Sequence, residues 1–254
     1  MTHAIILAAG RGSRLSHEVP EGLPKCLLEF GGRSLIARHM DLLYRLGVRT
    51  MDLVLGYRAQ RIIDHIATLD SRPDVAFHFN PRYELGSVLS LLAAGDALRS
   101  GRDILLMDAD VLYHPEILQR LVESPVENCY LLDREFESGD EPVKIALHDG
   151  QIVDFRKQLP EDLDYDELGE SVGFFRFGPR AAECIADECA RYESEGLGDA
   201  PHEEALRDVL LSCPLAFGFE DVTGLPWVEI DFPEDVERAR DVVLPAIRAQ
   251  YPEF

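Results

Sequence analysis

The chain has 254 residues, of which 46% are hydrophobic, so it is long enough for one large domain or two small ones with a sizeable core. Its 47 acidic and 25 basic residues give a formal net charge of -22, which repels nucleic-acid phosphates and anionic lipid headgroups, and we expect neither nucleic acid nor a membrane as partner. No apolar run approaches the roughly 20 residues that span a bilayer and no signal peptide is recognisable, so the sequence predicts a cytoplasmic protein.

Strand and helix patterns alternate along the first half of the chain. Strands are expected at residues 4–8, 51–55, 75–79 and 103–107, and helices at 34–46, 58–69 and 88–98. Such alternation with short connections predicts an α/β fold whose mostly parallel sheet is covered by helices on both faces. Ligands in these folds bind at the carboxyl ends of the strands, which here are followed by residues 9–14, 80–87 and 108–110.

The second half of the chain has a different pattern. Apolar residues alternate in 143–147 and 152–155 around a His148-Asp149-Gly150-Gln151 turn, which predicts a β-hairpin. The other expected elements are a strand at 171–177, helices at 179–195 and 202–211, an extended segment at 227–230, and a closing helix at 233–250 with Pro in its first turn.

The loop after the first strand combines little side-chain bulk with positive charge. Ala8, Ala9, Gly10 and Gly12 allow backbone N–H groups to approach an anion, and Arg11 and Arg14 supply charge. The Walker pattern is absent, and the dinucleotide pattern GxGxxG fails because Leu15 replaces its last glycine. By itself the GxG sequence fits a tight turn as well as an anion site.

Two apolar segments end in pairs of acidic residues. LLMDADV (105–111) places Asp108 and Asp110 on the same side of a strand end, and WVEIDFPED (227–235) places Glu229 and Asp231 ahead of a helix. Carboxylate oxygens are the ligands that Mg²⁺ prefers. However, DxD is common in loops, and Glu234 and Asp235 are explained by the dipole of the helix they begin.

These loops resemble those of a known family. The stretch ILAAGRGSRL followed by LPKCLLEFGGRSLI is similar to the LAAGxGxR…PK signature of nucleotidyltransferases, and the likeness is greatest to cytidylyltransferases acting on phosphocholine or 2-aminoethylphosphonate. The resemblance implies a single-domain, Rossmann-like (GT-A-like) nucleotidyltransferase fold with a small β-hairpin acceptor subdomain. It divides the domain, 1–254, into a nucleotide-binding half (1–125), an acceptor-binding half (126–232) and a closing helix (233–254).

The resemblance also implies roles for residues at matching positions. Lys25 and Arg14 would neutralise the phosphates, and Asp110 and Asp231 would bind Mg²⁺, which makes these four the expected catalytic residues. In NPRYELGSVLSL (80–91), the family places residues that recognise the base, although Ser87 could equally cap a helix. The expected nucleotide-binding residues are Leu7, Ala8, Ala9, Gly10, Arg11, Gly12, Gly86, Ser87, Ser90 and Asp108.

Acceptor binding is assigned to residues of the second half. Lysine is rare in this chain, and two of its three lysines, Lys144 and Lys157, lie on the expected hairpin arms. With Glu170 and Glu229, they are the expected acceptor-binding residues, although cross-strand salt bridges explain the lysines too. Phe136 and Tyr165, in acidic loops, could hold a cationic group.

The resemblance therefore predicts Mg²⁺-dependent transfer of CMP from CTP to a small phosphate or phosphonate acceptor, with release of pyrophosphate. A sugar-1-phosphate or inositol-phosphate nucleotidylyltransferase is the alternative of the same class, and a glycosyltransferase of related fold is another. A non-catalytic nucleotide-binding regulator is the alternative of a different class. A homodimer is left open.

Overall fold

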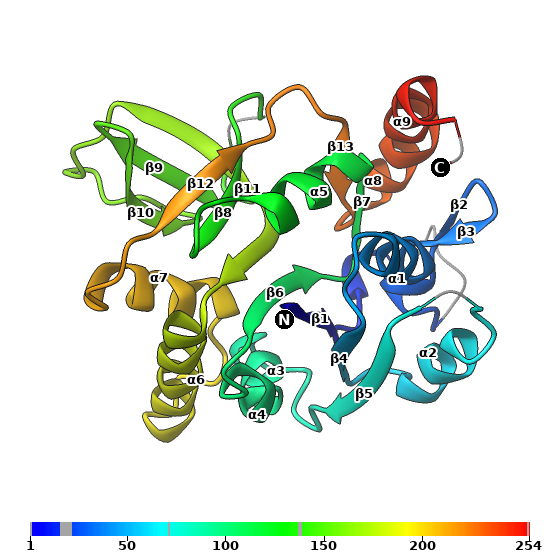
Figure 1. Cartoon of the computed structure of the whole chain (residues 1–254), viewed down its shortest axis with the longest axis horizontal. Helices are drawn as coiled ribbons and strands as arrows, with labels where there is room; N and C mark the ends of the chain where they lie inside the picture. Colours follow the sequence, from blue (N-terminus) through cyan, green and yellow to red (C-terminus); the bar gives the residue numbers. More distant parts are fainter. Residues whose placement is uncertain (1, 16–21, 71, 137–138, 253) are drawn as a thin grey trace.

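The computed structural model describes residues 2–15, 22–70, 72–136, 139–252 and 254. A central sheet runs through these residues, in the order β10-β9-β11-β6-β1-β4-β5, with β8 on β11 and β12 on β8 (Figure 1). The strands of its parallel core are β1 (Thr2–Ala8), β4 (Thr50–Leu55), β5 (Asp74–Phe79) and β6 (Asp103–Asp108). This core is the part of the sheet whose strand ends carry the predicted loops.

An antiparallel part extends the sheet beyond β6. It is joined through β11 (Glu167–Phe177), which pairs with β6, β8 and β9. The other antiparallel strands there are β8 (Cys129–Asp133), β9 (Lys144–His148) and β10 (Gln151–Arg156). The strand β12 (Gly218–Asp221) pairs with β8 in parallel. The predicted α/β fold, with its parallel core and a hairpin at one end, is confirmed.

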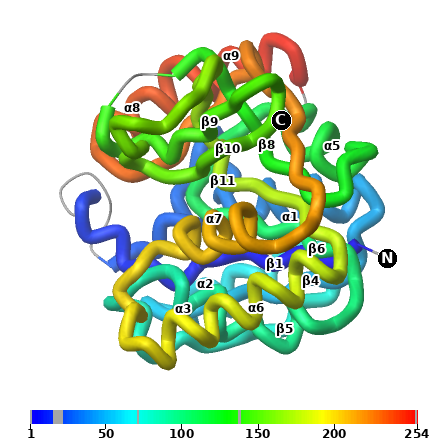
Figure 2. The backbone as a smooth tube through the Cα atoms, turned by 90° about the vertical axis from the view of Figure 1, so that its left-hand side faces the viewer, coloured from blue at the N-terminus to red at the C-terminus, as the bar shows by residue number. Residues whose placement is uncertain are grey.

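Helices cover both faces of the sheet, because alternate residues of each central strand are apolar on opposite sides. Ala4, Ile6 and Ala8 of β1 face one buried cluster, and Ile5 and Leu7 face another. On the first face lie α1 (Leu35–Arg45), α2 (Ala59–Ile66), α5 (Pro115–Glu123), α8 (Pro233–Arg238) and α9 (Leu244–Gln250). On the second lie α3 (Val88–Ala93), α4 (Gly95–Leu98), α6 (Pro179–Ser194) and α7 (His202–Ser212) (Figures 1 and 2).

Two expected helices differ in detail from the prediction. The helix expected at 88–98 is divided at Ala94 (φ -93°, ψ 16°), ahead of Gly95, a residue that disfavours helix interiors. The closing helix contains a π-helical turn, Ala239–Val243, just before Pro245. Since proline has no N–H to donate to the preceding turn, the wider turn accommodates it.

The predicted His148-Asp149-Gly150-Gln151 turn of the hairpin is confirmed. Gln151 pairs with His148, which leaves Asp149 (φ 49°) and Gly150 (φ 73°) as the two loop residues between the strands. Positive φ at both positions is the geometry of a two-residue type I′ turn, for which Asp-Gly is a favoured sequence. Among the described residues, no helix has both the length and the apolar composition that crossing a membrane requires.

His39 of α1 contacts the backbone of the loop that follows β6. The imidazole is fully buried, with Nε2 3.2 Å from the Ala109 carbonyl oxygen and Nδ1 3.1 Å from the Tyr113 hydroxyl. An Nε2–H tautomer satisfies both contacts, because it donates to the carbonyl and accepts from the hydroxyl. Burial lowers the pKa of His39 to about 4, although the bond to Ala109 opposes this shift.

This burial predicts an acid-sensitive stability. In the unfolded chain His39 gains a proton below its ordinary pKa of 6.5, whereas in the folded chain it stays neutral down to about 4. The unfolded state therefore binds more protons in that interval, and His39 should make the free energy of unfolding rise with pH by up to about 1.4 kcal/mol per unit. Urea denaturation from pH 4.5 to 7.5 should show a shallower dependence in His39→Gln; parallel curves would contradict the assignment.

Candidate active site

The loop after β1 packs closely over Lys25. Gly12 has a positive φ of 64°, and a Cβ atom there would lie 2.8 Å from Cγ of Lys25. Lys25 itself opens a short 3₁₀ turn, Lys25–Leu27, after Pro24. Gly12 thus allows both the loop conformation and the passage of the lysine side chain beneath it.

A two-stranded antiparallel ribbon brings the acidic segments together. It consists of β7 (Val111–Tyr113) and β13 (Trp227–Glu229), and Glu229 pairs with Val111. Beyond the ribbon, the N–H of Ile230 donates to the carbonyl oxygen of Asp110 at 3.0 Å. This pairing places Asp110 beside Glu229 and Asp231, and one carboxylate oxygen from each lies within 4.8 Å of the others. We call these three residues the carboxylate trio.

The Lys25 ammonium lies between two members of the trio. Its Nζ donates to Oδ2 of Asp110 at 2.9 Å and to Oδ1 of Asp231 at 2.6 Å. Burial alone would lower the pKa of Lys25, but the two carboxylates outweigh burial and raise it above its ordinary value. In the same way, burial would raise the pKa of Asp231, and Lys25 holds it below its ordinary value.

Glu229 is the trio member that Lys25 does not contact. Its side chain is exposed and lines a cavity. Desolvation by nearby protein atoms, together with repulsion from Asp110 and Asp231, raises the pKa of Glu229 well above its ordinary value. A divalent cation fits this donor set, since three clustered carboxylates offer hard oxygen ligands and an excess of negative charge. The sequence had assigned Glu229 to the acceptor rather than to this trio.

A helix start fixes the position of Asp231. The Asp235 carboxylate accepts hydrogen bonds from the backbone N–H groups of Asp231 and Phe232, at 3.0 and 2.7 Å. Asp235 is thus occupied at the first turn of α8, as the sequence suggested for an acid at a helix start. The rigid cap keeps the Asp231 backbone in place beside β13.

Other predicted basic residues surround the trio at the surface. Arg14 lies 3.4 Å from both Asp231 and Glu141, and Lys157 lies 3.1 Å from the same Glu141 carboxylate. The Lys144 ammonium is instead bound by backbone carbonyl oxygens, those of Gly139 and Lys157. The structure therefore brings Arg14 and Lys157 together through Glu141, a residue not singled out from the sequence, while Lys144 fastens the hairpin to its neighbouring loop.

The segment predicted to recognise the base lies against the start of α7. The Gly86 N–H donates to Gly198, and a Cβ at Gly86 would lie 1.9 Å from the Ala200 carbonyl oxygen. Ser87 Oγ accepts from the N–H of His202, and the buried Ser90 Oγ accepts from the Asn80 amide. The hydroxyls of both serines are engaged within the protein, and their role toward a base stays a prediction.

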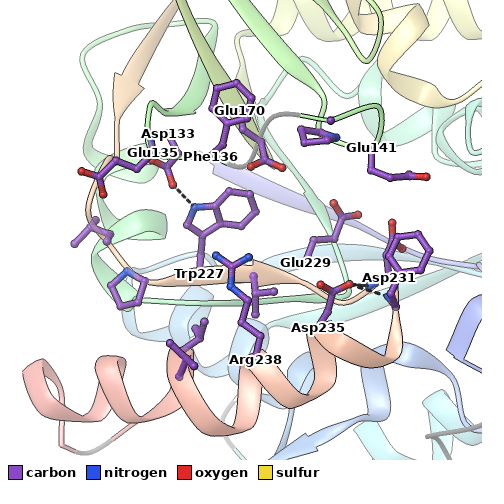
Figure 3. A pocket seen from close by; sticks show the side chains of 18 of the residues that line it. Asp133, Glu135, Phe136, Glu141, Glu170, Trp227, Glu229, Asp231, Asp235 and Arg238 are labelled. Atoms are coloured by element: carbon purple, nitrogen blue, oxygen red, sulfur yellow. Dashed lines mark hydrogen bonds between the residues drawn. The ribbon is translucent and has the colours of Figure 1, made fainter.

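Next to the trio is a cavity of about 510 Å³ with a strongly acidic lining (Figure 3). Trp227 lies across it, and its indole N–H donates to Asp133 at 2.7 Å. Phe136 lines the cavity as well, but Tyr165 is not among its lining residues. Among the described residues of the lining, one is basic, Arg238, and the acidic ones are Asp133, Glu135, Asp140, Glu141, Glu170, Glu229, Asp231 and Asp235.

Trp227, Asp133 and Arg238 were not selected from the sequence. Trp227 is the only tryptophan of the chain and lies two positions before Glu229 on β13. Its rarity and its position beside an acidic segment were therefore a usable sequence signal. Asp133 and Arg238 had none, because each reaches the cavity through tertiary packing of β8 and α8.

The chain is similar to known proteins along most of its length. A family model described as "MobA-like NTP transferase domain" matches residues 4–159, which is more than half of the chain. Among curated relatives, a "Bifunctional IPC transferase and DIPP synthase" of Rubrobacter xylanophilus is 29% identical over 95% of this chain and 52% of its own length. A "CMP-5'-(3-aminopropyl)phosphonate synthase" of Streptomyces rubellomurinus is 25% identical, over 93% of this chain and 38% of its own length.

The chain thus spans about half, or less, of the length of these two relatives. A third, the "CTP:phosphoglutamine cytidylyltransferase" of Campylobacter jejuni, is matched over 98% of its length and 92% of this chain at 25% identity. Solved structures of similar fold include the inositol-1-phosphate CTP transferase from T. maritima, with a TM-score of 0.73, 21% identity, and coverage of 97% of this chain and 96% of that one. At such identity the structural likeness establishes the fold alone.

The trio and Lys25 predict competition for the carboxylates. Because the lysine ammonium neutralises Asp110 and Asp231, a divalent cation must displace it to bind both. In Lys25→Met, without nucleotide, we expect Mg²⁺ to bind about tenfold or more tightly than in the wild type, as measured by isothermal titration calorimetry. Lys144→Met is the matched control, because the Lys144 ammonium binds the carbonyl groups of Gly139 and Lys157 and, within the described part of the chain, no carboxylate of the trio. Equal Mg²⁺ affinity in Lys25→Met and wild type would mean that the trio does not bind the ion.

Proposed function

We propose that this chain, which belongs to the MobA-like NTP transferase family, transfers CMP from CTP to a small acceptor that carries a phosphate or phosphonate group. The observation that carries this proposal is the carboxylate trio with Lys25 placed between two of its members, beside a loop of small residues. Phosphoryl-transfer sites need clustered carboxylates for a metal ion and a cation for phosphate oxygens. CTP as donor is supported by two relatives, one named as a synthase of a CMP-phosphonate and the other as a CTP-dependent cytidylyltransferase.

The reaction requires alignment and charge neutralisation rather than a strong base. An oxygen of the acceptor, already anionic near neutral pH, attacks the α-phosphorus of CTP and forms a new P–O bond. The bond to the bridging oxygen of the β-phosphate breaks, and pyrophosphate leaves with the electron pair. Lys25 and Arg14 lie where they can neutralise phosphate oxygens during this exchange.

The trio is suited to hold Mg²⁺, which would supply charge neutralisation at the phosphates and a fixed orientation for them. Asp110 and Asp231 remain our choice of principal ligands, and Glu229 becomes the third candidate. Asp235 acts indirectly, because its hydrogen bonds to the backbone of Asp231 and Phe232 fix the position of Asp231. The hydrogen bond from the Ile230 N–H to the Asp110 carbonyl oxygen fixes the segment of Asp231 relative to Asp110.

The acidic surroundings of the trio favour an acceptor with a cationic group, of the phosphocholine or 2-aminoethylphosphonate type. The phosphate of an uncharged sugar would bring only negative charge. The described lining of the cavity already carries eight acidic side chains, which would repel it. A positively charged end offsets that repulsion. Inositol phosphate is the alternative of the same class, since one solved structure of similar fold is an inositol-1-phosphate CTP transferase.

Removal of one trio member should stop the reaction. We expect Asp110→Ala to lower the rate of CTP-dependent pyrophosphate release by about 10²-fold or more, because it removes a charge that holds the metal ion. The measurement is a coupled pyrophosphate assay, with circular dichroism to show an intact fold. Asp187→Asn is the control, since Asp187 pairs with Arg99 at the surface of α6. Substantial residual activity in Asp110→Ala would remove Asp110 from the metal site.

An acceptor screen tests the substrate class. We expect pyrophosphate release from CTP with 2-aminoethylphosphonate or phosphocholine, and much less with inositol 1-phosphate or glucose 1-phosphate, because only the first two bring a cationic end to the acidic site. Turnover with sugar phosphates alone would refute the cationic acceptor. Binding of CTP without pyrophosphate release in any mixture would instead support the non-catalytic regulator.

A further inference from the structure

Arg238 is the one basic residue among the described residues that line the acidic cavity, and the proposed reaction gives it no role so far. It ends α8, and its exposed side chain points from the helix into the cavity (Figure 3). The trio members Glu229 and Asp231 line the same cavity. The Arg238 guanidinium therefore faces the same space as two of the three clustered carboxylates.

No carboxylate of the described residues pairs with Arg238, although eight acidic side chains share its cavity. The Asp235 carboxylate, three positions earlier on α8, accepts hydrogen bonds from two backbone N–H groups instead. Asp231 is held by Lys25 and Arg14. The acids nearest to Arg238 along the chain are thus engaged elsewhere, and its guanidinium donors stay available to a ligand.

An acid on the wall opposite α8 is held in place as well (Figure 3). The Asp133 carboxylate accepts hydrogen bonds from the indole N–H of Trp227 at 2.7 Å and from the backbone N–H of Glu135 at 2.9 Å. Trp227 in turn belongs to β13, the strand that carries Glu229. These bonds keep that wall apart from Arg238, so the cavity between them remains open to a small molecule.

The charge of the lining favours the acceptor over the nucleotide as the occupant of this cavity. A triphosphate brings several negative charges, which eight acidic side chains would repel. The described residues of the loop after β1, which carries Arg11 and Arg14, do not line the cavity. An acceptor with one phosphate or phosphonate group brings less negative charge, and a cationic end would be attracted by the acids. The cavity volume of about 510 Å³ is ordinary for a small-molecule site.

We propose that Arg238 binds the phosphate or phosphonate group of the acceptor in the cavity beside Glu229 and Asp231. A guanidinium is planar and offers paired N–H donors, which match two oxygens of such a group. Its positive charge offsets the repulsion between this group and the acidic lining. The inference rests on the proposed function, and it names the residue that holds the attacking group of the acceptor.

Kinetic constants of matched variants test this role. Arg238→Met should raise the KM for 2-aminoethylphosphonate about 10- to 100-fold, the usual cost of a lost hydrogen bond to a charged group, with little change in the KM for CTP. Arg238→Lys should recover part of the loss, because it keeps the charge but not the paired donors. Arg240→Met is the control, since Arg240 is exposed two positions further on and is not among the lining residues.

Binding of two fragments shows which end of the acceptor Arg238 holds. Ethylphosphonate carries the anionic group without an amine, and choline carries a cationic group without a phosphate. In isothermal titration calorimetry, Arg238→Met should bind ethylphosphonate about tenfold or more weakly than wild type. It should bind choline equally well or more tightly, because a positive charge has been removed from the cavity. Neither measurement requires turnover.

Several outcomes would overturn the inference. An unchanged KM for the acceptor in Arg238→Met, or ethylphosphonate binding that is absent in wild type or equal in both proteins, means that Arg238 does not hold this group. A raised KM for CTP alone would assign Arg238 to the nucleotide, and an equal loss in Arg240→Met would indicate a general effect of charge. If wild type turns over no acceptor but binds ethylphosphonate through Arg238, the proposed reaction fails and the binding site stands.

Discussion

Repulsion among Asp110, Glu229 and Asp231 is the constraint on which the site depends. Backbone pairing between β7 and β13, and the bond from Ile230 to Asp110, hold these carboxylates within 4.8 Å of one another. Like charges at that separation destabilise the folded chain unless a cation lies among them. Lys25 provides that cation, and Gly12 gives its side chain the space to reach it. The fold therefore maintains three clustered carboxylates, of which Lys25 contacts two.

The parallel core could be predicted from the sequence because its signals are local. Apolar runs of strand length alternate with helical periodicity from Thr2 to Asp108, and each pattern reports the burial of its own segment. The strands β8 and β12 were not predicted, since they are short and pair across distant parts of the chain. Helix α5 was missed as well, although His114 caps it and Pro115 begins it. A cap of this kind is a weaker sequence signal than Ser or Asp.

The site could be predicted only in part, because it also depends on pairing between distant parts of the chain. Residue type and spacing identified Asp110 and Asp231 as metal-ligand candidates, and the family resemblance assigned them to one site. Their proximity depends on a ribbon between segments about 120 residues apart. Glu229 was assigned to the acceptor, because a spacing of two residues from Asp231 predicts the same side only along a strand, and β13 ends at Glu229. Arg238 had no sequence signal, since its place in the cavity lining is a property of the packed structure.

The distribution of charge explains how a chain of net charge -22 can accept an anionic nucleotide. Arg11, Arg14 and Lys25 lie on or under one loop, so the local field at the end of β1 differs from that of the whole surface. Acidic side chains gather in the lining of the adjoining cavity. The positive charge beside β1 therefore offsets, at one loop, the repulsion that the rest of the surface exerts on phosphate groups. Phosphate oxygens that bind there would be held by side chains that the fold already positions, which lowers the entropic cost of aligning them.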